Sequence, residues 1–250
     1  MSELKGRIAA VTGAANGIGR AVARQLAANG ATVALLDIDA TALVAACGEI
    51  RQASGQAMPF PVDLLKLDAI EAVFAKVAAD LGPVDILVNN VGGSARKKSS
   101  EFWCAAPETI EFIVTLNLFA TLRCTRQVVA GMRERKWGKI VNISSDAAFH
   151  GDPNIVDYAT AKAGILGFTR SLASEMAKHK VNVNAVCPGS TNTKAAEEWT
   201  PEVRAFAASA PLGAMCEPDD IANAVSHLVS EKARFVTGDV MVVNGGRAYR

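Results

Sequence analysis

Tyr158 and Lys162 stand four residues apart in a stretch whose pattern predicts a helix over about 158–178. On a helix this spacing places both side chains on one face, one turn apart. A free tyrosine has a pKa of about 10 and is a poor base at neutral pH, but a neighbouring ammonium favours the phenolate and lowers that pKa. The pair is therefore expected to transfer a proton, with Tyr158 as general base or general acid. Taken alone, the pair fits an ordinary exposed helix pair equally well.

A glycine-rich turn lies between a first apolar run, residues 8–11, and a helical segment that extends to about residue 29. Glycines permit a tight turn and let the backbone approach a pyrophosphate, whose charge then meets the amides at the helix N-terminus. The turn is therefore expected to bind a dinucleotide, although three glycines can also simply make a turn. Its expected contact residues are Gly13, Asn16, Gly17, Ile18 and Gly19.

Asp37 ends the second apolar run, 18 residues after Gly19. A carboxylate at this point can accept hydrogen bonds from the adenosine ribose hydroxyls and repels a 2′-phosphate. Asn16 brings no positive charge for such a phosphate either. Both features favour NAD over NADP. The alternatives are that Asp37 caps the turn toward the next helix, and that Asp39 takes the ribose role.

Short apolar runs alternate with helical segments along the whole chain. The runs are 8–11, 32–36, 57–62, 86–88, 140–143, 181–187 and 240–243, and further helices are expected at 41–53, 66–81, 107–135, 158–178 and 218–230. Continuously apolar strands imply a sheet covered on both faces. Regular alternation implies parallel strands joined by right-handed crossovers. We therefore expect one doubly wound, Rossmann-like α/β domain over residues 1–250.

In such a sheet, ligands bind beyond the carboxyl ends of the strands. The residues that follow the apolar runs are Thr12–Gly19, Asp37, Asp63, Asn89–Gly92, Ser144, Ser145, Pro188 and Gly189. These segments are therefore expected to meet at one edge of the sheet. Ser145 is expected there to bind the substrate oxygen and to steady the charge that develops on it.

As an ordered set, these motifs resemble those of the short-chain dehydrogenase/reductases, in their branch of about 250 residues. The resemblance rests on Thr12-Gly13-x-x-x-Gly17-Ile18-Gly19, Asn89-Asn90-Val91-Gly92, Tyr158-x-x-x-Lys162, Ser145 thirteen residues before Tyr158, and Pro188-Gly189-x-x-x-Thr193. It covers the whole chain and implies hydride transfer between a nicotinamide cofactor and an alcohol or ketone. Val91, where the family usually has alanine, removes no catalytic group.

The resemblance also assigns roles to individual residues. Lys162 would hold the nicotinamide ribose, and Asn117 would keep a water that links Lys162 to solvent; the alternative for Asn117 is a buried amide that bonds the local backbone. Asp63 resembles an acid near the adenine, or it N-caps the helix at 66–81. The implied catalytic residues are Asn117, Ser145, Tyr158 and Lys162, and the implied cofactor contacts are Gly13, Asn16, Gly17, Ile18, Gly19, Asp37, Asp63, Asn90, Tyr158, Lys162, Pro188, Gly189, Thr191 and Thr193.

Substrate contacts are expected from the loops 92–103, 146–157 and 189–213. Candidates by position are Ser94, Arg96, His150, Asn154, Val156 and Trp199. The run Arg96-Lys97-Lys98 can recruit a carboxylate, a coenzyme A phosphate or an acyl-carrier partner, but such a run is more often a solvated loop. Residues 89–93 resemble dehydrogenases of cis-diol carboxylates, and 145–148 with 186–189 resemble dehydrogenases of cyclic hydroxyacyl-CoA.

The expected function is an NAD-dependent oxidoreductase for a secondary alcohol that is cyclic or carries a carboxylate or acyl thioester. One alternative is an NADPH-dependent 3-oxoacyl-[acyl-carrier-protein] reductase. Another, of a different class, is an NAD-binding regulator without turnover. The resemblance also implies a homotetramer.

Composition excludes several other classes. The 26 Lys and Arg nearly balance the 25 Asp and Glu, which argues against a nucleic-acid binder. Five scattered cysteines without a Cys-x-x-Cys pair indicate neither disulfides nor zinc, and the dispersed histidines predict no catalytic metal. The N-terminus has no apolar signal segment, and no stretch is long and apolar enough to cross a membrane. A reduced, cytoplasmic setting is expected.

Overall fold

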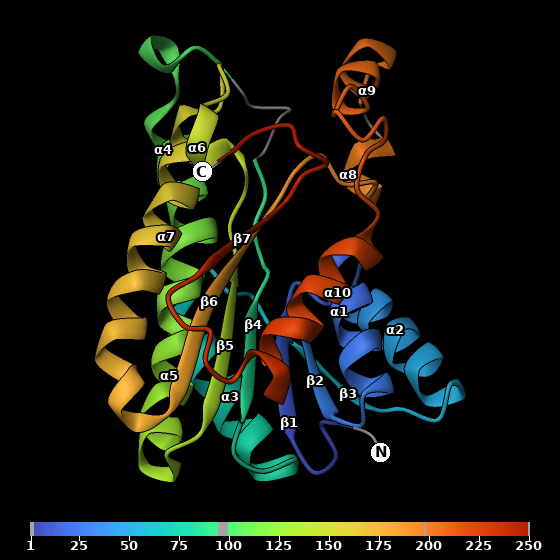
Figure 1. Ribbon diagram of the computed structural model, residues 1–250, viewed down its shortest axis with the longest axis vertical. Coiled ribbons are helices and arrows are strands. Elements are labelled where there is room, and N and C mark those ends of the chain that lie inside the picture. Colours follow the sequence, from blue (N-terminus) through green and yellow to red (C-terminus); the bar gives the residue numbers. More distant parts are fainter. Residues whose placement is uncertain (1–2, 95–99, 198, 250) are drawn as a thin grey trace.

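In the computed structural model, which describes residues 3–94, 100–197 and 199–249, seven strands form one sheet in the order β3-β2-β1-β4-β5-β6-β7 (Figure 1). All neighbouring strands run parallel. The strands are β1 (Ile8–Thr12), β2 (Thr32–Asp37), β3 (Gln56–Pro61), β4 (Ile86–Asn89), β5 (Gly138–Ile143), β6 (Val181–Pro188) and β7 (Val240–Val243). Connections leave β1 toward β2 on one side, whereas β4 lies on the other, so the topological switch falls between β1 and β4.

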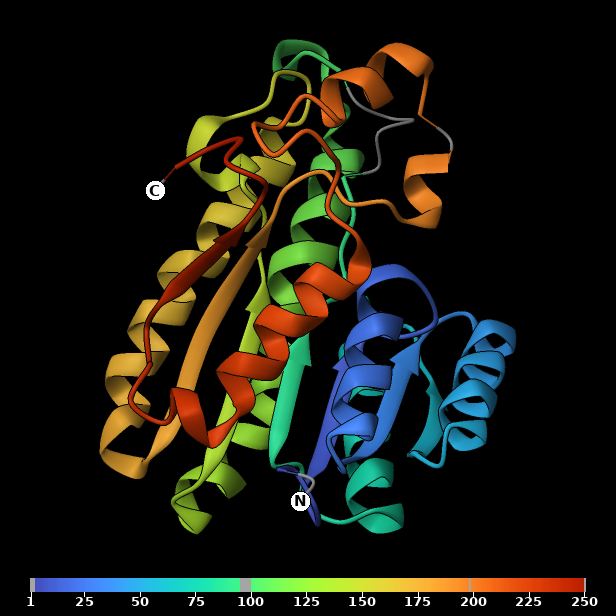
Figure 2. The same ribbon diagram turned by 45° about the vertical axis from the view of Figure 1, so that its right-hand side comes forward.

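Helices cover both faces of the sheet (Figure 2). One apolar core joins the sheet to α1 (Gly17–Ala28), α2 (Ala40–Gln52) and α10 (Pro218–Val229). A second core joins the opposite face to α3 (Leu67–Asp80), α5 (Ala120–Arg135) and α7 (Val156–Met176). Because both faces are buried, the strands are mostly apolar; all six residues of β5 are buried, among them the polar Lys139 and Asn142.

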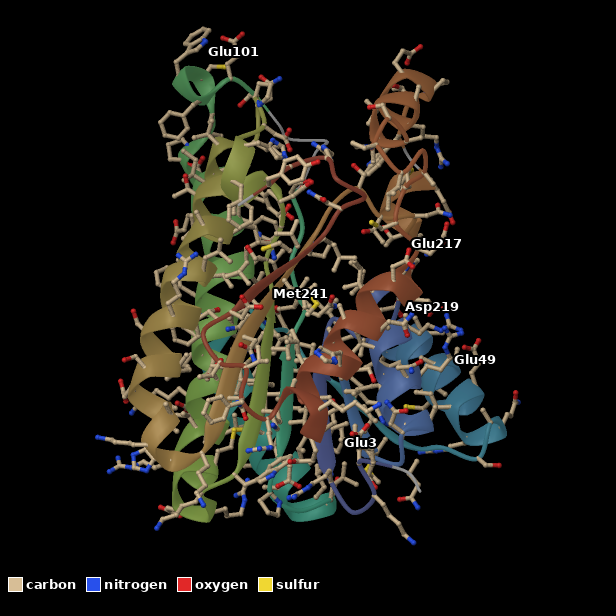
Figure 3. All side chains as sticks on the ribbon, viewed as in Figure 1. Glu3, Glu49, Glu101, Glu217, Asp219 and Met241 are labelled. Atoms are coloured by element: carbon tan, nitrogen blue, oxygen red, sulfur yellow. The ribbon has the colours of Figure 1, made fainter. Side chains whose placement is uncertain are left out.

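Ion pairs hold the helices of the first face to one another. Arg20 of α1 pairs with Glu49 of α2, and Arg24 pairs with Asp219 of α10. Glu49 and Asp219 lie on the same outer side of the molecule (Figure 3). The start of α10 is also closed locally, since the backbone N–H of Glu217 donates to Asp220 Oδ2 at 2.8 Å.

Most predicted elements lie within two residues of the observed ones, and the helix expected at 107–135 is continuous over those bounds but contains an unpredicted π-helical turn. It is divided into α4 (Pro107–Val114), a π-helical turn (Thr115–Phe119) and α5. Within the turn, the side-chain amide of Asn117 donates to Ile113 O at 2.9 Å, the carbonyl that a regular α-helix offers to the backbone N–H of residue 117. This competition explains why the helix widens there, and such turns frequently mark functional sites.

Shorter elements gather beyond the carboxyl ends of the strands. They are α6 (Ala147–His150), α8 (Lys194–Glu197) and α9 (Pro201–Ala207), together with the start of α4 (Figure 1). Single 3-10 turns occupy Phe102–Cys104, Ala177–His179 and Glu231–Ala233. Within the described part of the chain, every helix is too short or too polar to pass through a bilayer.

Candidate active site

A cavity of about 480 Å³ opens at the carboxyl ends of the strands, above the switch between β1 and β4. The turn after β1, the ends of β2, β4, β5 and β6, and the first turns of α7 contribute its walls. Fifteen residues proposed from the sequence line it: Gly13, Asn16, Gly17, Ile18, Asp37, Asn90, Ser94, Ser145, Tyr158, Lys162, Pro188, Gly189, Thr191, Thr193 and Trp199. The structure therefore brings the cofactor loop and the proton-transfer pair into one space.

Tyr158 and Lys162 face this cavity from successive turns of α7. The Lys162 Nζ lies 5.7 Å from the centroid of the half-buried Tyr158 ring. Lys162 is only 3% exposed, and its Nζ donates to Ile143 O at the end of β5 at 2.9 Å. A fixed ammonium so close to a phenol favours the phenolate form.

Burial makes the Lys162 ammonium costly. It lowers the pKa of Lys162 from 10.5 to about 8, and the neighbouring Cys187 opposes the effect. Burial also raises the pKa of the Cys187 thiol to about 11, so this thiol is neutral at physiological pH. The ammonium therefore has no full negative charge from Cys187 to balance it.

Ser145 lines the same cavity as this pair, two residues after the end of β5. Its neighbour Ser144 is buried and donates through Oγ to Lys162 O at 2.7 Å, which ties the strand end to α7. The Oγ of Ser145 accepts from the backbone N–H of Ala147 at 3.2 Å and lines the cavity. Its hydroxyl is thus held in place and can still donate to a substrate oxygen.

Asn117 does not line the cavity but supports its wall from below. Its Oδ1 accepts from Gly93 N, and its Nδ2 donates to Gly93 O, both at 3.0 Å. A Cβ on Gly92 would lie 2.5 Å from Asn117 Oδ1 and 3.0 Å from Lys162 Nζ. Gly92, in the loop after β4, therefore lies against both Asn117 and Lys162, and only glycine fits at this position. Asn117 bonds the local backbone as well, through Ile113, as the alternative for it described, and its water-holding role stays a prediction.

The turn after β1 is packed too closely for side chains. Gly13 has φ of +64°, and a Cβ on Gly19 would lie 2.0 Å from Gly13 O. Asn90 holds this turn from β4, because its Nδ2 donates to Thr12 O at 3.0 Å and to Gly13 O at 3.1 Å. The N-cap residue of α1, Asn16, makes no side-chain capping bond. The bare helix terminus and the close backbone fit a pyrophosphate group.

Asp37 reaches from the end of β2 to the same turn. Its Oδ2 accepts from Ala15 N and its Oδ1 from Asp39 N, both at 3.1 Å. Asp39 instead N-caps α2, where its side chain accepts from Ala42 N at 3.0 Å. Asp37 lines the cavity and Asp39 does not. The geometry thus separates the two acids that the sequence left in competition.

Other sequence-based candidates lie elsewhere. Asp63 accepts from Leu65 N at 3.0 Å, outside the residues that line the cavity, and the N-cap of α3 is Lys66 rather than Asp63. Asn154 and Val156 line a separate small depression with Ser94. His150, also outside the cavity lining, faces two carboxylates. Arg96, Lys97 and Lys98 lie outside the described residues.

Four charged residues of the cavity were missed by the sequence reasoning: Asp146, Asp152, Lys194 and Arg247. Lys194 lies in the loop 189–213, which was already expected to touch substrate. Asp146 follows Ser145 directly, and Asp152 lies in a loop already expected to touch substrate, so both carried a positional signal. Arg247 lies 95 residues from Asp152 and carried none. Within the described residues, no group of three His, Cys, Asp or Glu side chains is arranged to hold a metal.

Comparisons with known proteins give a consistent pattern. A family model described as short chain dehydrogenase matches residues 7–204. The chain is 37% identical over 246 residues to the 3-oxoacyl-[acyl-carrier-protein] reductase FabG of Aquifex aeolicus, covering 98% of each chain. It is 36% identical over 250 residues to the (2S)-[(R)-hydroxy(phenyl)methyl]succinyl-CoA dehydrogenase subunit BbsD of Thauera aromatica, again covering 98% of each.

The fold is also that of solved structures. A 7α-hydroxysteroid dehydrogenase complexed with NADH and 7-oxo glycochenodeoxycholic acid superposes with a TM-score of 0.93 and 32% identity. The match covers 98% of this chain and 95% of that one.

Proposed function

Because the chain belongs to the short-chain dehydrogenase/reductase family, whose members are oxidoreductases acting on CH–OH groups, we propose that it is an NAD-dependent enzyme that interconverts a secondary alcohol and its ketone. Tyr158 is its general acid/base. The observation that carries this proposal is the shared cavity: Ser145, Tyr158 and Lys162 line the same space as the glycine turn.

The residues present fit a nicotinamide dinucleotide. The turn at Gly13–Gly19 would hold the pyrophosphate, Asp37 the adenosine ribose, and Lys162 the second ribose. Pro188, Gly189, Thr191 and Thr193 would border the nicotinamide ring, and Asp63 remains a proposal for the adenine end. When bound, the cofactor supplies the acceptor or donor of a hydride.

The chain's own residues handle the proton and the charge. In the oxidation direction, Ser145 Oγ and Tyr158 Oη hold the substrate hydroxyl, and the Tyr158 phenolate takes its proton. The Lys162 ammonium, fixed by Ile143 O, stabilises that phenolate. Asn117 keeps the loop after β4 against Lys162 through its bonds to Gly93. In the reduction direction, Tyr158 returns the proton to the developing alkoxide.

The preference for NAD rests on Asp37. Its carboxylate faces the cavity at the end of β2, where the 2′-phosphate of NADP would meet its negative charge. The related hydroxysteroid dehydrogenase, whose structure holds NADH, gives independent support.

A second candidate is an NADPH-dependent 3-oxoacyl-[acyl-carrier-protein] reductase. The observation in its favour is the 37% identity to a reductase of that name. It requires NADPH preference and turnover of thioester ketones. Kinetic constants for both cofactors, measured with a β-ketoacyl thioester and with a cyclic ketone, separate the two candidates.

Tyr158→Phe tests for catalysis against an NAD-binding regulator. The chain has two tyrosines, Tyr158 and the 82%-exposed Tyr249, so Tyr249→Phe is a matched control. We expect Tyr158→Phe to bind NAD with unchanged affinity but to lose roughly 10³-fold in kcat, whereas Tyr249→Phe retains activity. Equal turnover in both variants would contradict the assigned role, and a wild type that binds NAD but oxidises no alcohol would favour the regulator.

The family resemblance also supports a cytoplasmic homotetramer. Phe112 and Phe119, one from α4 and one from the π-helical turn, are 39% and 43% exposed and provide apolar surface for subunit contacts. Light scattering that gives the mass of four chains would agree with the proposal, and a monomer would refute it.

A further inference from the structure

A group of charged side chains lines the same cavity as Tyr158. Arg247, from the segment after β7, donates through Nη1 to Ser190 Oγ at 2.8 Å and through Nη2 to Asp152 Oδ1 at 3.3 Å. Its Nε lies 3.9 Å from Asp146 Oδ2. All four residues line the cavity that holds Tyr158. Because Asp146, Asp152 and Ser190 all contact the Arg247 guanidinium, its orientation is set before any substrate binds.

The same group is well shielded from solvent. The side chains of Asp146, Arg247 and Asp152 are 4%, 16% and 20% exposed. Among the described residues, Asp146 Oδ2 accepts no hydrogen bond, although this oxygen is buried. Burial raises the pKa of Asp146, and Arg247 counteracts the effect. A buried oxygen in this position gains from a hydroxyl donor supplied by a ligand.

The charge balance shows which ligand fits. Over the described residues, this end of the cavity carries the positive Arg247 and the negative Asp146 and Asp152, a sum of −1. His150 lies 3.7 Å from each carboxylate and, when protonated, brings the sum to zero. Within the described part of the chain, this group leaves no surplus positive charge to balance an anionic substrate. A neutral hydroxyl, by contrast, can accept from Arg247 and donate to Asp152 at once.

Two other basic residues among those described line the cavity, Lys162 and Lys194. Lys162 is held at Ile143 O, beside Tyr158. Lys194 is exposed and also lines the cavity; its backbone lies near the glycine turn, because it follows Thr193, whose side chain lies about 3.1 Å from where a Cβ on Gly17 would be. The two ends of the cavity therefore differ in the ligand charge they favour.

We propose that Arg247 and Asp152 determine substrate specificity by binding a neutral hydroxyl group close to the reacting carbon. The preferred substrate is then a secondary alcohol with a neighbouring hydroxyl, such as a vicinal diol or polyol, rather than a hydroxy acid. This inference rests on the proposed function and narrows its substrate class.

Three probes that share one ring test the proposal: cis-1,2-cyclohexanediol, cyclohexanol and 2-hydroxycyclohexane-1-carboxylate. For the wild type we expect kcat/KM for the diol to exceed that for cyclohexanol by roughly ten- to hundredfold, with the carboxylate poorest, because buried polar groups left unpaired by the wrong substrate are costly. Arg247→Met should reduce the ratio of kcat/KM for the diol to kcat/KM for cyclohexanol to within about threefold, and this ratio is the readout. Asp152→Asn should raise kcat/KM for the carboxylate relative to the diol, since it removes one negative charge.

Matched controls are Arg234→Met and Asp68→Asn, both at exposed positions outside the cavity, which should leave all three values unchanged. Thermal unfolding checks that each variant folds. If Arg247→Met does not fold, Arg247→Lys replaces it, since lysine keeps the positive charge but lacks the two-pronged guanidinium. If Arg247→Met and Asp152→Asn turn over cyclohexanol and keep the diol preference of the wild type, the inference is overturned but the proposed function is not. The same holds if the wild type prefers the carboxylate. Turnover of none of the probes or their ketones, with either cofactor, would overturn the proposed function and the inference with it.

Discussion

Lys162→Met should stabilise the protein while abolishing its catalysis, because the wild type keeps a buried ammonium that the fold disfavours. The pKa of Lys162 falls from 10.5 in an unfolded chain to about 8 in the folded one. This difference corresponds to about 3 kcal/mol of lost stability at pH 7 and below, where both states are protonated. Methionine is one heavy atom shorter than lysine, is similarly flexible and carries no charge. The lost bond to Ile143 O offsets about 1 kcal/mol of the gain.

The dependence on pH isolates this effect from other consequences of the substitution. Between pH 8 and 10.5 the unfolded state binds more protons at Lys162 than the folded state, so the stability of the wild type rises with pH in that range. Relative to Lys162→Met, the wild type should gain about 2 kcal/mol between pH 7 and 9.5. The Cys187 thiol, with its pKa of about 11, remains protonated over most of this range and supplies no compensating charge.

Urea denaturation of the two proteins without cofactor, at a fixed chain concentration and at several pH values, measures this difference. Lys232→Met is the matched control, since Lys232 is exposed, and its stability should track that of the wild type at every pH. A constant difference between wild type and Lys162→Met from pH 7 to 9.5 would refute the reasoning. It would show that the folded protein holds the Lys162 ammonium at no electrostatic cost.

Three further substitutions test the geometry of the site. Gly92→Ala should lower kcat at least tenfold, because its Cβ would displace Asn117 Oδ1. Gly93→Ala, whose Cβ meets nothing within 4 Å, should retain most activity. Steady-state kinetics that show an equal loss of kcat in both variants would contradict this prediction. Asp37→Ala should weaken NAD binding about tenfold and reduce the preference for NAD over NADP, as measured by titration with each cofactor. An unchanged ratio of the two dissociation constants would show that Asp37 does not set the cofactor preference. Gly48→Ala, inside α2 with open space around the new Cβ, should raise the free energy of unfolding by about 0.5–1 kcal/mol, and a decrease in chemical denaturation would show hidden strain.

Much of the fold was predictable from the sequence because its signals are local. Apolar runs in a covered parallel sheet and apolar stripes on helices depend on neighbouring residues, so the strands and most helices lie within two residues of their predicted bounds. The π-helical turn at Thr115–Phe119, inside the helix expected at 107–135, was not predicted. There the side chain of Asn117 competes with the backbone for Ile113 O, and hydrophobic periodicity carries no trace of that competition.

The order and spacing of its motifs alone determined that this chain would carry a glycine turn, an acid after the second strand and a tyrosine–lysine pair on one helix face. Only the tertiary structure decided how these groups meet. It placed Asp37 rather than Asp39 at the cavity, left Gly92 no room beside Asn117 and Lys162, and brought Arg247 to Asp152 from 95 residues away. Spacing along a helix or strand follows from local geometry, whereas such contacts depend on how the whole sheet and its helices pack.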